Sequence, residues 1–385
     1  MKNIHSVIGL GYGDEGKGVT VDYLCSKYDP EDVYVVRHSG GHQVGHTVMI
    51  YNTIHEFRHF GAGTMRGVPT IWSKRCTVSP FGFRQERDIL LGKKIYPKLF
   101  VHSLCPVTTL YDIAYNRTYN RERGIFNSVG VGFSSTLIRH ETVPLYVSDL
   151  HFKQVLQNKL NSINKHYYDK CQKEGVWKSF KDELAILIEQ SNGIDFLDDC
   201  DYFIDNIVTY QDGFDPFVKN VVFEGNQGIL LDKNHGFYPN VTHGTTTNAT
   251  LKDWTNEVVD TWYPTRIYST RHGDGPFFMD GKLDVELRNT EHESNHNNNH
   301  QGVFRYAPLN IDLLQYALLV DQLYVKTRRQ HVVVTCFDQL DSQHAPYCIK
   351  DELCKGDVMA ELEKSLDWVK LYVNASPRSN TVAAW

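Results

Sequence analysis

Short apolar runs alternate along the chain with longer segments in which apolar residues recur at helical spacing. The runs that predict β-strands lie at 4–10, 32–36, 70–74, 98–104, 220–225, 265–270, 330–338 and 370–375. The segments that predict amphipathic helices lie at 19–28, 149–175, 179–190, 310–324 and 357–369. Strands that alternate with helices are typical of a parallel sheet covered by helices. The pattern therefore predicts an α/β fold with a largely parallel central sheet and flanking helices, organised as one domain over 1–385 with a helical insertion near 149–210.

Composition narrows the classes of partner. The chain has 385 residues, with 46 acidic against 40 basic side chains and a net charge of −6, which gives no electrostatic case for binding nucleic acid. No apolar run approaches the roughly 20 residues that a membrane span needs, so we expect no membrane partner. The eight cysteines contain no C-x-x-C pair, and the N-terminus does not resemble a signal peptide. We therefore expect a cytoplasmic protein with reduced thiols.

The stretch 9-GLGYGDEGKG-18 lies between the first predicted strand and the first predicted helix. Gly11, Gly13 and Gly16 fit the dinucleotide fingerprint G-x-G-x-x-G. Gly11, Gly16 and Lys17 equally fit most of a phosphate-binding P-loop, G-x-x-x-x-G-K. A structural turn without a ligand is the third interpretation.

The residues around this loop separate the alternatives. A dinucleotide site needs an acid about 20 residues onward, at the end of the second strand, but that strand ends in Arg37 and His38. Asp14 and Glu15 would also repel a pyrophosphate, whereas a magnesium ion and a lysine remove that objection. We therefore expect a P-loop-related phosphate site, although Gly18 stands where such a loop has a Ser or Thr metal ligand.

A second dense cluster, 37-RHSGGHQVGHT-47, is rich in glycine and histidine. His42 and His46 are four residues apart, a spacing that is often structural or forms a weak metal site. Near a phosphate loop, a protonated imidazole can instead stabilise charge on a transferring phosphoryl group. The cluster therefore contains a candidate catalytic acid.

Two further stretches carry polar side chains of interest. In 223-FEGNQGILLDKNHGFYPNVT-242, Gln227 follows a strand directly, and its amide suits a purine edge. The alternative is an ordinary turn at a strand end. The segment 289-NTEHESNHNNNHQG-302 is polar and rich in Asn, which predicts a mobile, solvated or substrate-closing loop. Its histidines at four-residue steps favour a metal site less, because Asn disfavours the helix that such a site needs; they are His292, His296 and His300.

Together these stretches resemble the signatures of the adenylosuccinate synthetase family. Four signatures stand in order: G-D-E-G-K-G, R-x-x-G-G-H-x-x-G-H-T, F-E-G-x-Q-G-x-x-L-D-x-x-x-G-x-Y-P-x-V-T and Y-S-T-R-x-G-x-G-P-F. They occupy 13–18, 37–47, 223–242 and 268–277. The resemblance implies an ATP- or GTP-dependent C–N ligase that phosphorylates O6 of a purine nucleotide and lets aspartate displace the phosphate. It also implies Mg²⁺ as cofactor and a homodimer.

The resemblance implies a role for each matching residue. Asp14, His46 and Lys17 are expected to be catalytic, with Asp14 taking the N1 proton, and the Asp14 carboxylate and Gly45 carbonyl are expected to hold magnesium. The phosphate site is implied at Gly13, Glu15, Gly16, Lys17, Gly18 and Thr47. The purine nucleotide site is implied at Gln43, Asn127, Ser128, Arg139, Asn226, Gln227 and Thr242, and the resemblance allows a second subunit to contribute Arg139. Arg305 is expected to hold aspartate, and Asp338, Ser376 and Pro377 to contact the donor base.

Departures from the family pattern bear on the substrate. Val303 stands where the family has an arginine at the ribose, which suits a deoxynucleotide, and Cys336 replaces a lysine that packs on guanine. Asn226 stands where the family commonly has Ala, and its amide could accept from a guanine 2-amino group. These departures resemble the bacteriophage 2-aminoadenylosuccinate synthetase branch, which joins aspartate to dGMP with ATP or dATP and makes N6-succino-2-amino-2'-deoxyadenylate. Asp14 keeps the cellular pattern. An ordinary synthetase acting on IMP and GTP, and a P-loop regulator without ligase activity, are the alternatives.

Overall fold

The computed structural model describes residues 3–125, 128–213, 219–291, 293, 295 and 300–385. Its centre is a ten-stranded sheet in the order β19-β18-β15-β11-β1-β10-β2-β6-β8-β9. Every neighbouring pair is parallel except β18 and β19, so the predicted fold class is confirmed. The strands are β1 Asn3–Gly9, β2 Val33–Arg37, β6 Thr70–Trp72, β8 Leu99–His102, β9 Val208–Tyr210, β10 Asn220–Gly228, β11 Val259–Arg266, β15 Thr327–Thr335, β18 Lys370–Asn374 and β19 Val382–Ala384.

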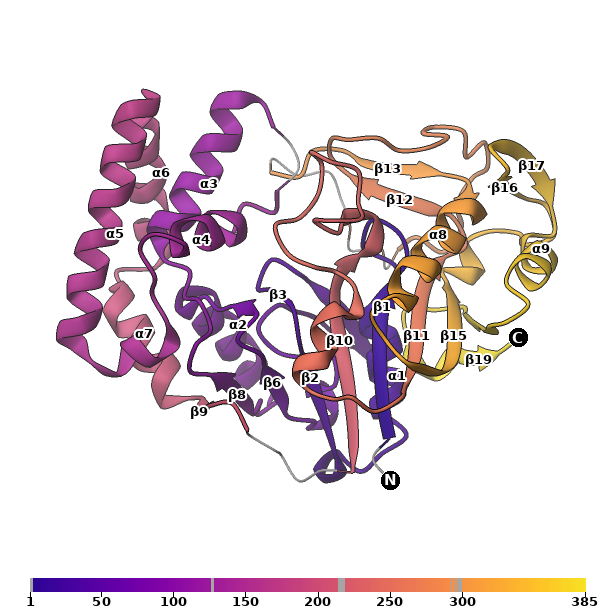
Figure 1. Ribbon diagram of the computed structural model, residues 1–385, viewed down its shortest axis with the longest axis horizontal. Helices are drawn as coiled ribbons and strands as arrows, with labels where there is room; N and C mark the ends of the chain where they lie inside the picture. The colour runs from indigo at the N-terminus through magenta and orange to yellow at the C-terminus, as the bar shows by residue number, and fades with distance from the viewer. Residues whose placement is uncertain (1–2, 126–127, 214–218, 292, 294, 296–299) are drawn as a thin grey trace.

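Helices flank the sheet, and several of them form a separate group beyond its β9 edge (Figure 1). That group starts at α3, well before the 149–175 segment in which the sequence pattern places the first insertion helix. The early helix escapes the pattern because its buried side includes Asp112 and Asn116. The helices are α1 Lys17–Cys25, α2 Pro80–Gly92, α3 Leu110–Arg123, α4 Phe133–His140, α5 Lys153–Glu174, α6 Trp177–Gln190, α7 Phe196–Asp205, α8 Ile311–Gln322 and α9 Val358–Ser365.

The strand predicted at 265–270 is wrong in its bounds. The segment straddles the end of β11 and the start of β12 (Ser269–His272), which pairs with β13 (Phe304–Ala307) in a separate small sheet. Pro264 lies inside β11, where it cannot donate to the ladder, so the sequence argues against a central strand there. The remaining short strands are β3 Gly40–Gly41, β4 His46–Ile50, β5 Thr53–Phe57, β7 Cys76–Thr77, β14 Leu309–Asn310, β16 Ala345–Ile349 and β17 Glu352–Gly356.

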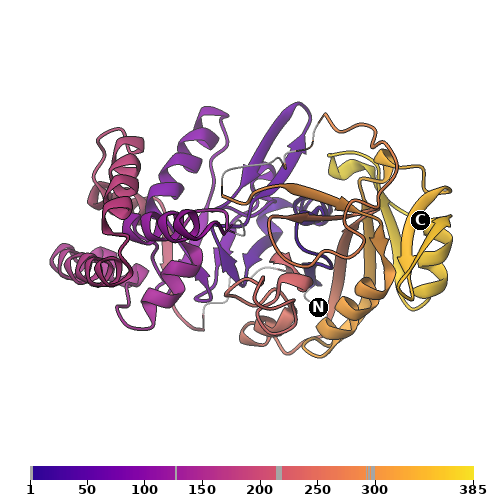
Figure 2. The ribbon, with the colours of Figure 1, turned by 90° about the horizontal axis from the view of Figure 1, so that it is seen from above.

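The arrangement of the sheet places the loops that matter at one edge. β1 and β10 lie side by side in its middle, and both are almost fully buried. The loops after β1, β2, β10, β11, β15 and β18 leave the carboxyl ends of parallel strands, the usual position of a ligand site in such sheets. Viewed from above, the helical group and the β12–β13 sheet lie on opposite sides of this edge (Figure 2). No helix in the described part of the chain is long and apolar enough to cross a bilayer.

Candidate active site

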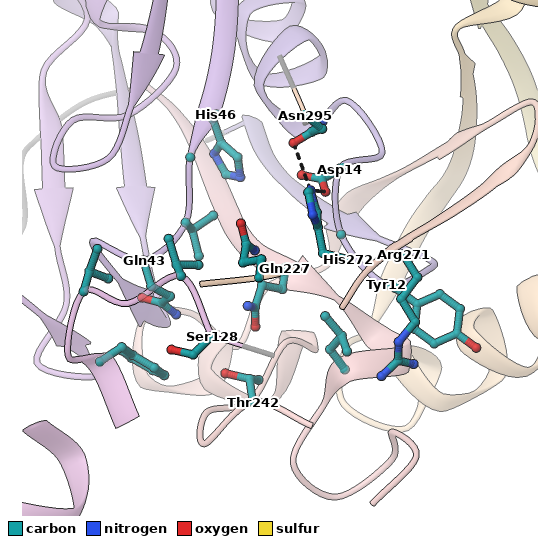
Figure 3. A pocket seen from close by; sticks show the side chains of 18 of the residues that line it. Tyr12, Asp14, Gln43, His46, Ser128, Gln227, Thr242, Arg271, His272 and Asn295 are labelled. Atoms are coloured by element: carbon teal, nitrogen blue, oxygen red, sulfur yellow. Dashed lines mark hydrogen bonds and ion pairs between the residues drawn. The ribbon is translucent and has the colours of Figure 1, made fainter. Parts of the chain in front are cut away.

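A cavity of about 770 Å³ opens at this edge and is lined by the loops that follow those strands. Figure 3 shows side chains from several of the loops pointing into it. Asn127 lies outside the described residues, and Asn226 and Arg305 do not line the cavity. The expected site residues that do line it are Gly13, Asp14, Glu15, Gly16, Lys17, Gly18, Gln43, Gly45, His46, Thr47, Ser128, Arg139, Gln227, Thr242, Asp338, Ser376 and Pro377.

The glycine loop after β1 is folded around one of its own acids. The Glu15 carboxylate accepts hydrogen bonds from the backbone N–H of Gly11 (2.9 Å) and of Gly13 (2.7 Å), and it pairs with Lys17 at 3.2 Å. These are groups that a P-loop offers to phosphate. A Cβ at Gly11 would come within 2.9 Å of the same carboxylate, so the loop needs glycine there. A phosphate that uses these donors must displace Glu15.

The missing Ser or Thr at Gly18 has a steric cause. A Cβ at this first turn of α1 would lie 2.8 Å from the Thr47 carbonyl oxygen and 3.1 Å from His46 Cβ. Contacts under 3.0 Å do not occur for real Cβ atoms unless the neighbour moves. The helix therefore packs directly against the second signature, and this close approach brings the two loops together.

Asp14 is held in the cavity wall by its backbone and by one imidazole. Its φ of 62° is in the left-handed region, which costs a non-glycine residue energy. The Arg266 guanidinium donates to the Asp14 carbonyl at 2.6 Å, and His272 Nε2 lies 3.4 Å from Asp14 Oδ2. Withdrawal from bulk water raises the pKa of the Asp14 carboxyl, against the opposing charges of His272 and Arg266. A raised pKa makes this carboxylate a better base.

His46 is oriented by a fully buried acid. Its Nδ1 lies 2.7 Å from Glu224 Oε1, and its Nε2 is buried with no hydrogen-bond partner among the described residues. Burial lowers the pKa of the His46 imidazole, while Glu224 raises it. Burial alone would raise the pKa of the Glu224 carboxyl, but His46 brings it below its usual value. The pair leaves Nε2 available to a ligand in the cavity, as expected of a catalytic imidazole.

The other histidine of the cluster is structural. His42 bonds through Nε2 to the Val131 carbonyl at 2.9 Å and stacks on His59 with 5.6 Å between ring centroids. Burial lowers the pKa of His42 to about 3, so the ring is neutral. The i, i+4 pair therefore divides into one structural ring and one that faces the cavity.

Polar side chains gather at one end of the cavity, which we call the nucleotide end: Gln43, His46, Ser128, Gln227 and Thr242. Both amide atoms of Gln43 and the Oε1 of Gln227 are buried and have no hydrogen-bond partner among the described residues. Ser128 contacts Asn116 at 3.0 Å, and Thr242 also points inward (Figure 3). Buried amides without partners suit a ligand that offers both donors and acceptors.

Asn226, which is expected to read a base, does not line the cavity. Its Nδ2 donates to Ser39 Oγ (3.2 Å) and to the Thr245 carbonyl (2.9 Å). Successive side chains of a strand point to opposite faces, so Gln227 enters the cavity while its neighbour in β10 turns away. The Nδ2 of Asn226 therefore braces the turn, while its Oδ1 is buried with no hydrogen-bond partner among the described residues.

Arg139 also differs from the expectation, because its own chain occupies its guanidinium. It forms an ion pair with Asp112 at 2.9 Å and donates to the Val107 (2.7 Å) and Val143 (2.8 Å) carbonyls. Only 1% of the residue is exposed. A side chain held this way contacts nucleotide phosphate, in its own subunit or in a second one, only if these bonds break.

Arg305 lies beside the cavity rather than in its wall. Its guanidinium pairs with Asp280 at 2.9 Å and donates to the Gly275 carbonyl at 3.0 Å. Arg271, its direct partner in the β12–β13 ladder, does line the cavity, and its guanidinium lies 4.5 Å from the centre of the Tyr12 ring. An incoming carboxylate would have to compete with Asp280 for Arg305.

The expected donor-base residues Asp338, Ser376 and Pro377 line another part of the cavity, which together with Asn289 we call the donor end. The Asp338 carboxylate accepts from Asn289 Nδ2 at 3.1 Å. Ser376 Oγ lies 3.0 Å from Thr381 Oγ1 and accepts from the Arg378 backbone N–H at 3.1 Å. These polar groups of the donor end already have partners, unlike the amide atoms of Gln43 and the Oε1 of Gln227.

The sequence interpretation did not single out Arg266 and His272, which both line the cavity. Arg266 links the glycine loop after β1 to the polar segment 289–302, because it donates to the Asp14 carbonyl and forms an ion pair with Glu293 at 2.5 Å. His272 fills an open position of the fourth signature, and only its place beside that signature could have drawn attention to it. His292 and His296 lie outside the described residues, and among those described no three His, Cys, Asp or Glu side chains form a metal site.

Comparisons with known proteins point to one family. The family profile described as Adenylosuccinate synthetase matches residues 6–370. The chain is 29% identical to the adenylosuccinate synthetase of Blochmanniella pennsylvanica over 59% of its length and 52% of the relative, so the match spans about half of that protein. It is 29% identical to that of Buchnera aphidicola over 72% of this chain and 66% of the relative.

Two solved structures share the fold. The fully ligated adenylosuccinate synthetase of Plasmodium falciparum superposes with a TM-score of 0.72 at 16% identity and 100% coverage of both chains. The succinoaminodeoxyadenylate synthetase of cyanophage S-2L, bound to dGMP and to dATP as an energy donor, gives a TM-score of 0.67 at 15% identity, covering 100% of this chain and 95% of that one. The signatures, the cavity that they form and the profile match over nearly the whole chain lead to one conclusion: the chain belongs to the adenylosuccinate synthetase family.

Proposed function

We propose that the protein is a ligase that joins L-aspartate to C6 of a purine nucleoside monophosphate, using a nucleoside triphosphate and a 6-phosphoryl intermediate. One observation carries the proposal. The Asp14 carboxylate, the free Nε2 of His46 and the amide of Gln227 come from three separate loops and line one cavity. A base, an acid and a purine-reading amide in one cavity match this chemistry better than simple nucleotide binding does.

The chemistry requires each of these groups. A purine 6-oxo group leaves poorly, so it must become a phosphate ester before an amine can replace it. Asp14, with its raised pKa, takes the N1 proton and makes O6 a nucleophile. His46 Nε2 then faces the transferring phosphoryl group, whose negative charge opposes the effect of burial and favours a protonated ring. Glu224 holds that ring in place.

Magnesium fits the residues present. Mg²⁺ keeps several waters and is commonly bound through one or two carboxylates together with substrate phosphates. Asp14 supplies one carboxylate at the cavity wall, and Gly45 lines the same wall. We propose that these two residues hold the ion, which neutralises charge on the phosphates when it is bound.

For the substrate, we propose dGMP with ATP or dATP. Val303 offers no polar group to a ribose 2'-hydroxyl, and Cys336 replaces a positively charged side chain at the donor end. The cyanophage protein of the same fold is described with dGMP and dATP bound. The role of Asn226 in reading a guanine 2-amino group stays a prediction, because its Oδ1 is buried without a partner among the described residues but the residue does not line the cavity.

An ordinary synthetase acting on IMP and GTP is the second candidate. The curated relatives at 29% identity carry that name, and the resemblance in the first signature assigns an aspartate at the position of Asp14 to cellular synthetases. The two candidates differ at both ends of the cavity, so one assay can separate them.

The experiment is a matrix of IMP, dIMP, GMP and dGMP against ATP, dATP and GTP with aspartate and magnesium. Product mass and phosphate release are the readouts. We expect the highest kcat/KM for dGMP with ATP or dATP. Equal or higher efficiency with IMP and GTP would establish the second candidate, and nucleotide turnover that ignores aspartate would indicate a regulator without ligase activity.

A further inference from the structure

His272 lies at the end of β12, inside the fourth signature but at a position that the signature leaves open. Its side chain is 13% exposed and lines the cavity. The ring packs on Phe304 with 4.5 Å between centroids and an interplanar angle of 33°. Strand pairing and this ring contact hold the imidazole in a fixed place beside the glycine loop.

The contacts of His272 point to Asp14. Nε2 lies 3.4 Å from Asp14 Oδ2 and 3.5 Å from Asn295 Oδ1, as the dashed lines in Figure 3 show. A single N–H favours the carboxylate, because hydrogen bonds to an ionised acceptor are about twice as strong as neutral ones. Both distances are long, and catalytic contacts of this kind commonly shorten once ligand is bound.

Asp14 depends on this contact for the direction of its carboxylate. Its backbone is fixed by the bond from Arg266 to its carbonyl oxygen. Within the described part of the chain, the carboxylate itself has one ion-pair partner closer than 4 Å, which is His272. The backbone of Asp14 is therefore anchored by one residue and its side chain by another.

We propose that His272 is a positioning residue for Asp14. It donates its Nε2–H to Oδ2 and turns the carboxylate so that the second oxygen faces the bound purine. The role rests on the proposed function, in which Asp14 takes the N1 proton. His272 itself exchanges no proton in this account. A ring that orients the base affects the chemical step and leaves substrate affinity nearly unchanged.

The test compares two substitutions at this position. His272→Leu removes the donor, whereas His272→Gln places an amide N–H near the position of Nε2. We expect His272→Leu to lower kcat by roughly 10- to 100-fold, the range seen when a residue that orients a reacting group is lost, while the KM for the nucleotide stays within about twofold. His272→Gln is expected to recover most of the lost rate. His344→Gln, at an exposed histidine paired with Asp341, is the matched control and should change neither constant.

A second readout does not use activity. Asp14→Asn, His272→Leu and the double variant form a cycle in urea unfolding. The effect of the double variant on the unfolding equilibrium constant should differ from the product of the two single effects by about threefold or more, as expected for residues in contact. The role is overturned if His272→Leu keeps kcat within twofold of the parent, if His272→Gln recovers nothing, or if the cycle shows no coupling. A parent protein without ligase activity but with clear coupling would overturn the proposed function instead and leave the contact established.

Discussion

The two ends of the cavity differ in how their polar groups are satisfied. At the nucleotide end, His46 Nε2, both amide atoms of Gln43 and Gln227 Oε1 are buried without partners in the described structure. Arg305, which lies beside the cavity, pairs instead with Asp280, and Asp338 at the donor end pairs with Asn289. A buried polar atom without a partner costs about 1–3 kcal/mol.

The two ends therefore differ in what a ligand must do to bind. Several polar atoms of the nucleotide end have no partner in the described structure, and a ligand there supplies the missing hydrogen bonds. Aspartate and the donor nucleotide must instead displace bonds that the protein already makes. We therefore expect substitutions at the nucleotide end to act on the chemical step, and those near Arg305 and Asp280 to act on apparent affinity.

The largest effect is expected from Asp14→Asn. The amide cannot take the N1 proton, so kcat should fall by about 100- to 10,000-fold, while nucleotide affinity, measured by calorimetry, stays within a few-fold of the parent. Turnover within threefold of the parent would remove Asp14 from the chemical step and with it the distinction between the two ends.

Next comes Glu224→Gln, which keeps the size of the side chain but weakens its hold on His46. We expect kcat to fall by roughly 10- to 100-fold with little change in KM. Glu86→Gln is the matched control, because Glu86 also pairs with a buried histidine, His59 at 3.0 Å, but lines no part of the cavity. A control that loses as much kcat as Glu224→Gln would show that buried Glu–His pairs act through stability alone.

The third prediction concerns the stability of the fold at low pH. Burial lowers the pKa of His38 and of His42 to about 3 each, below the value of about 6.5 in an unfolded chain. The unfolded chain therefore binds more protons below pH 6.5, and stability falls as the pH falls toward 3. Each ring contributes a slope of about 1.4 kcal/mol per pH unit. Urea unfolding at pH 7, 6 and 5 measures it. A free energy of unfolding that stays flat over this range would show that the two rings are not held neutral in the folded protein.

The smallest effects are expected at Arg305 and Asp280. Asp280→Asn should lower the aspartate KM by roughly two- to fivefold, because it weakens a competing ion pair. Arg305→Leu should raise the aspartate KM by about tenfold or more, because it removes a two-pronged carboxylate partner. Initial rates across aspartate concentrations give both values. If Arg305→Leu leaves the aspartate KM unchanged, the carboxylate is held by another residue, and Arg271 in the cavity wall is the first to test.

Sequence alone predicted the central sheet, and it singled out three stretches that the structure brings to one cavity, for a common reason. Apolar runs reveal buried strands, and Asp14, His46 and Gln227 lie in contiguous glycine-rich stretches. The pattern missed α3, whose buried side is partly polar, and displaced β11, which contains Pro264.

Contacts between distant parts of the chain could not be predicted from the sequence pattern. Glu224 meets His46 across 178 positions, and Asp280 meets Arg305 only because of the β12–β13 ladder. The contacts of Asn226 Nδ2 with Ser39 and with the Thr245 carbonyl join positions far apart in the sequence in the same way. Residue types predict what a side chain can do, and the fold decides what it faces.

The fate of the purine 6-oxygen shows whether the reaction passes through a 6-phosphoryl intermediate. The substrate nucleotide, dGMP or IMP, is labelled with oxygen-18 at O6 and turned over with unlabelled triphosphate and aspartate, and the released phosphate is examined by mass spectrometry. Phosphoryl transfer to O6 followed by displacement with aspartate predicts that the phosphate carries the label. Unlabelled phosphate formed alongside the aspartate adduct would contradict the 6-phosphoryl intermediate and the roles given to Asp14 and His46.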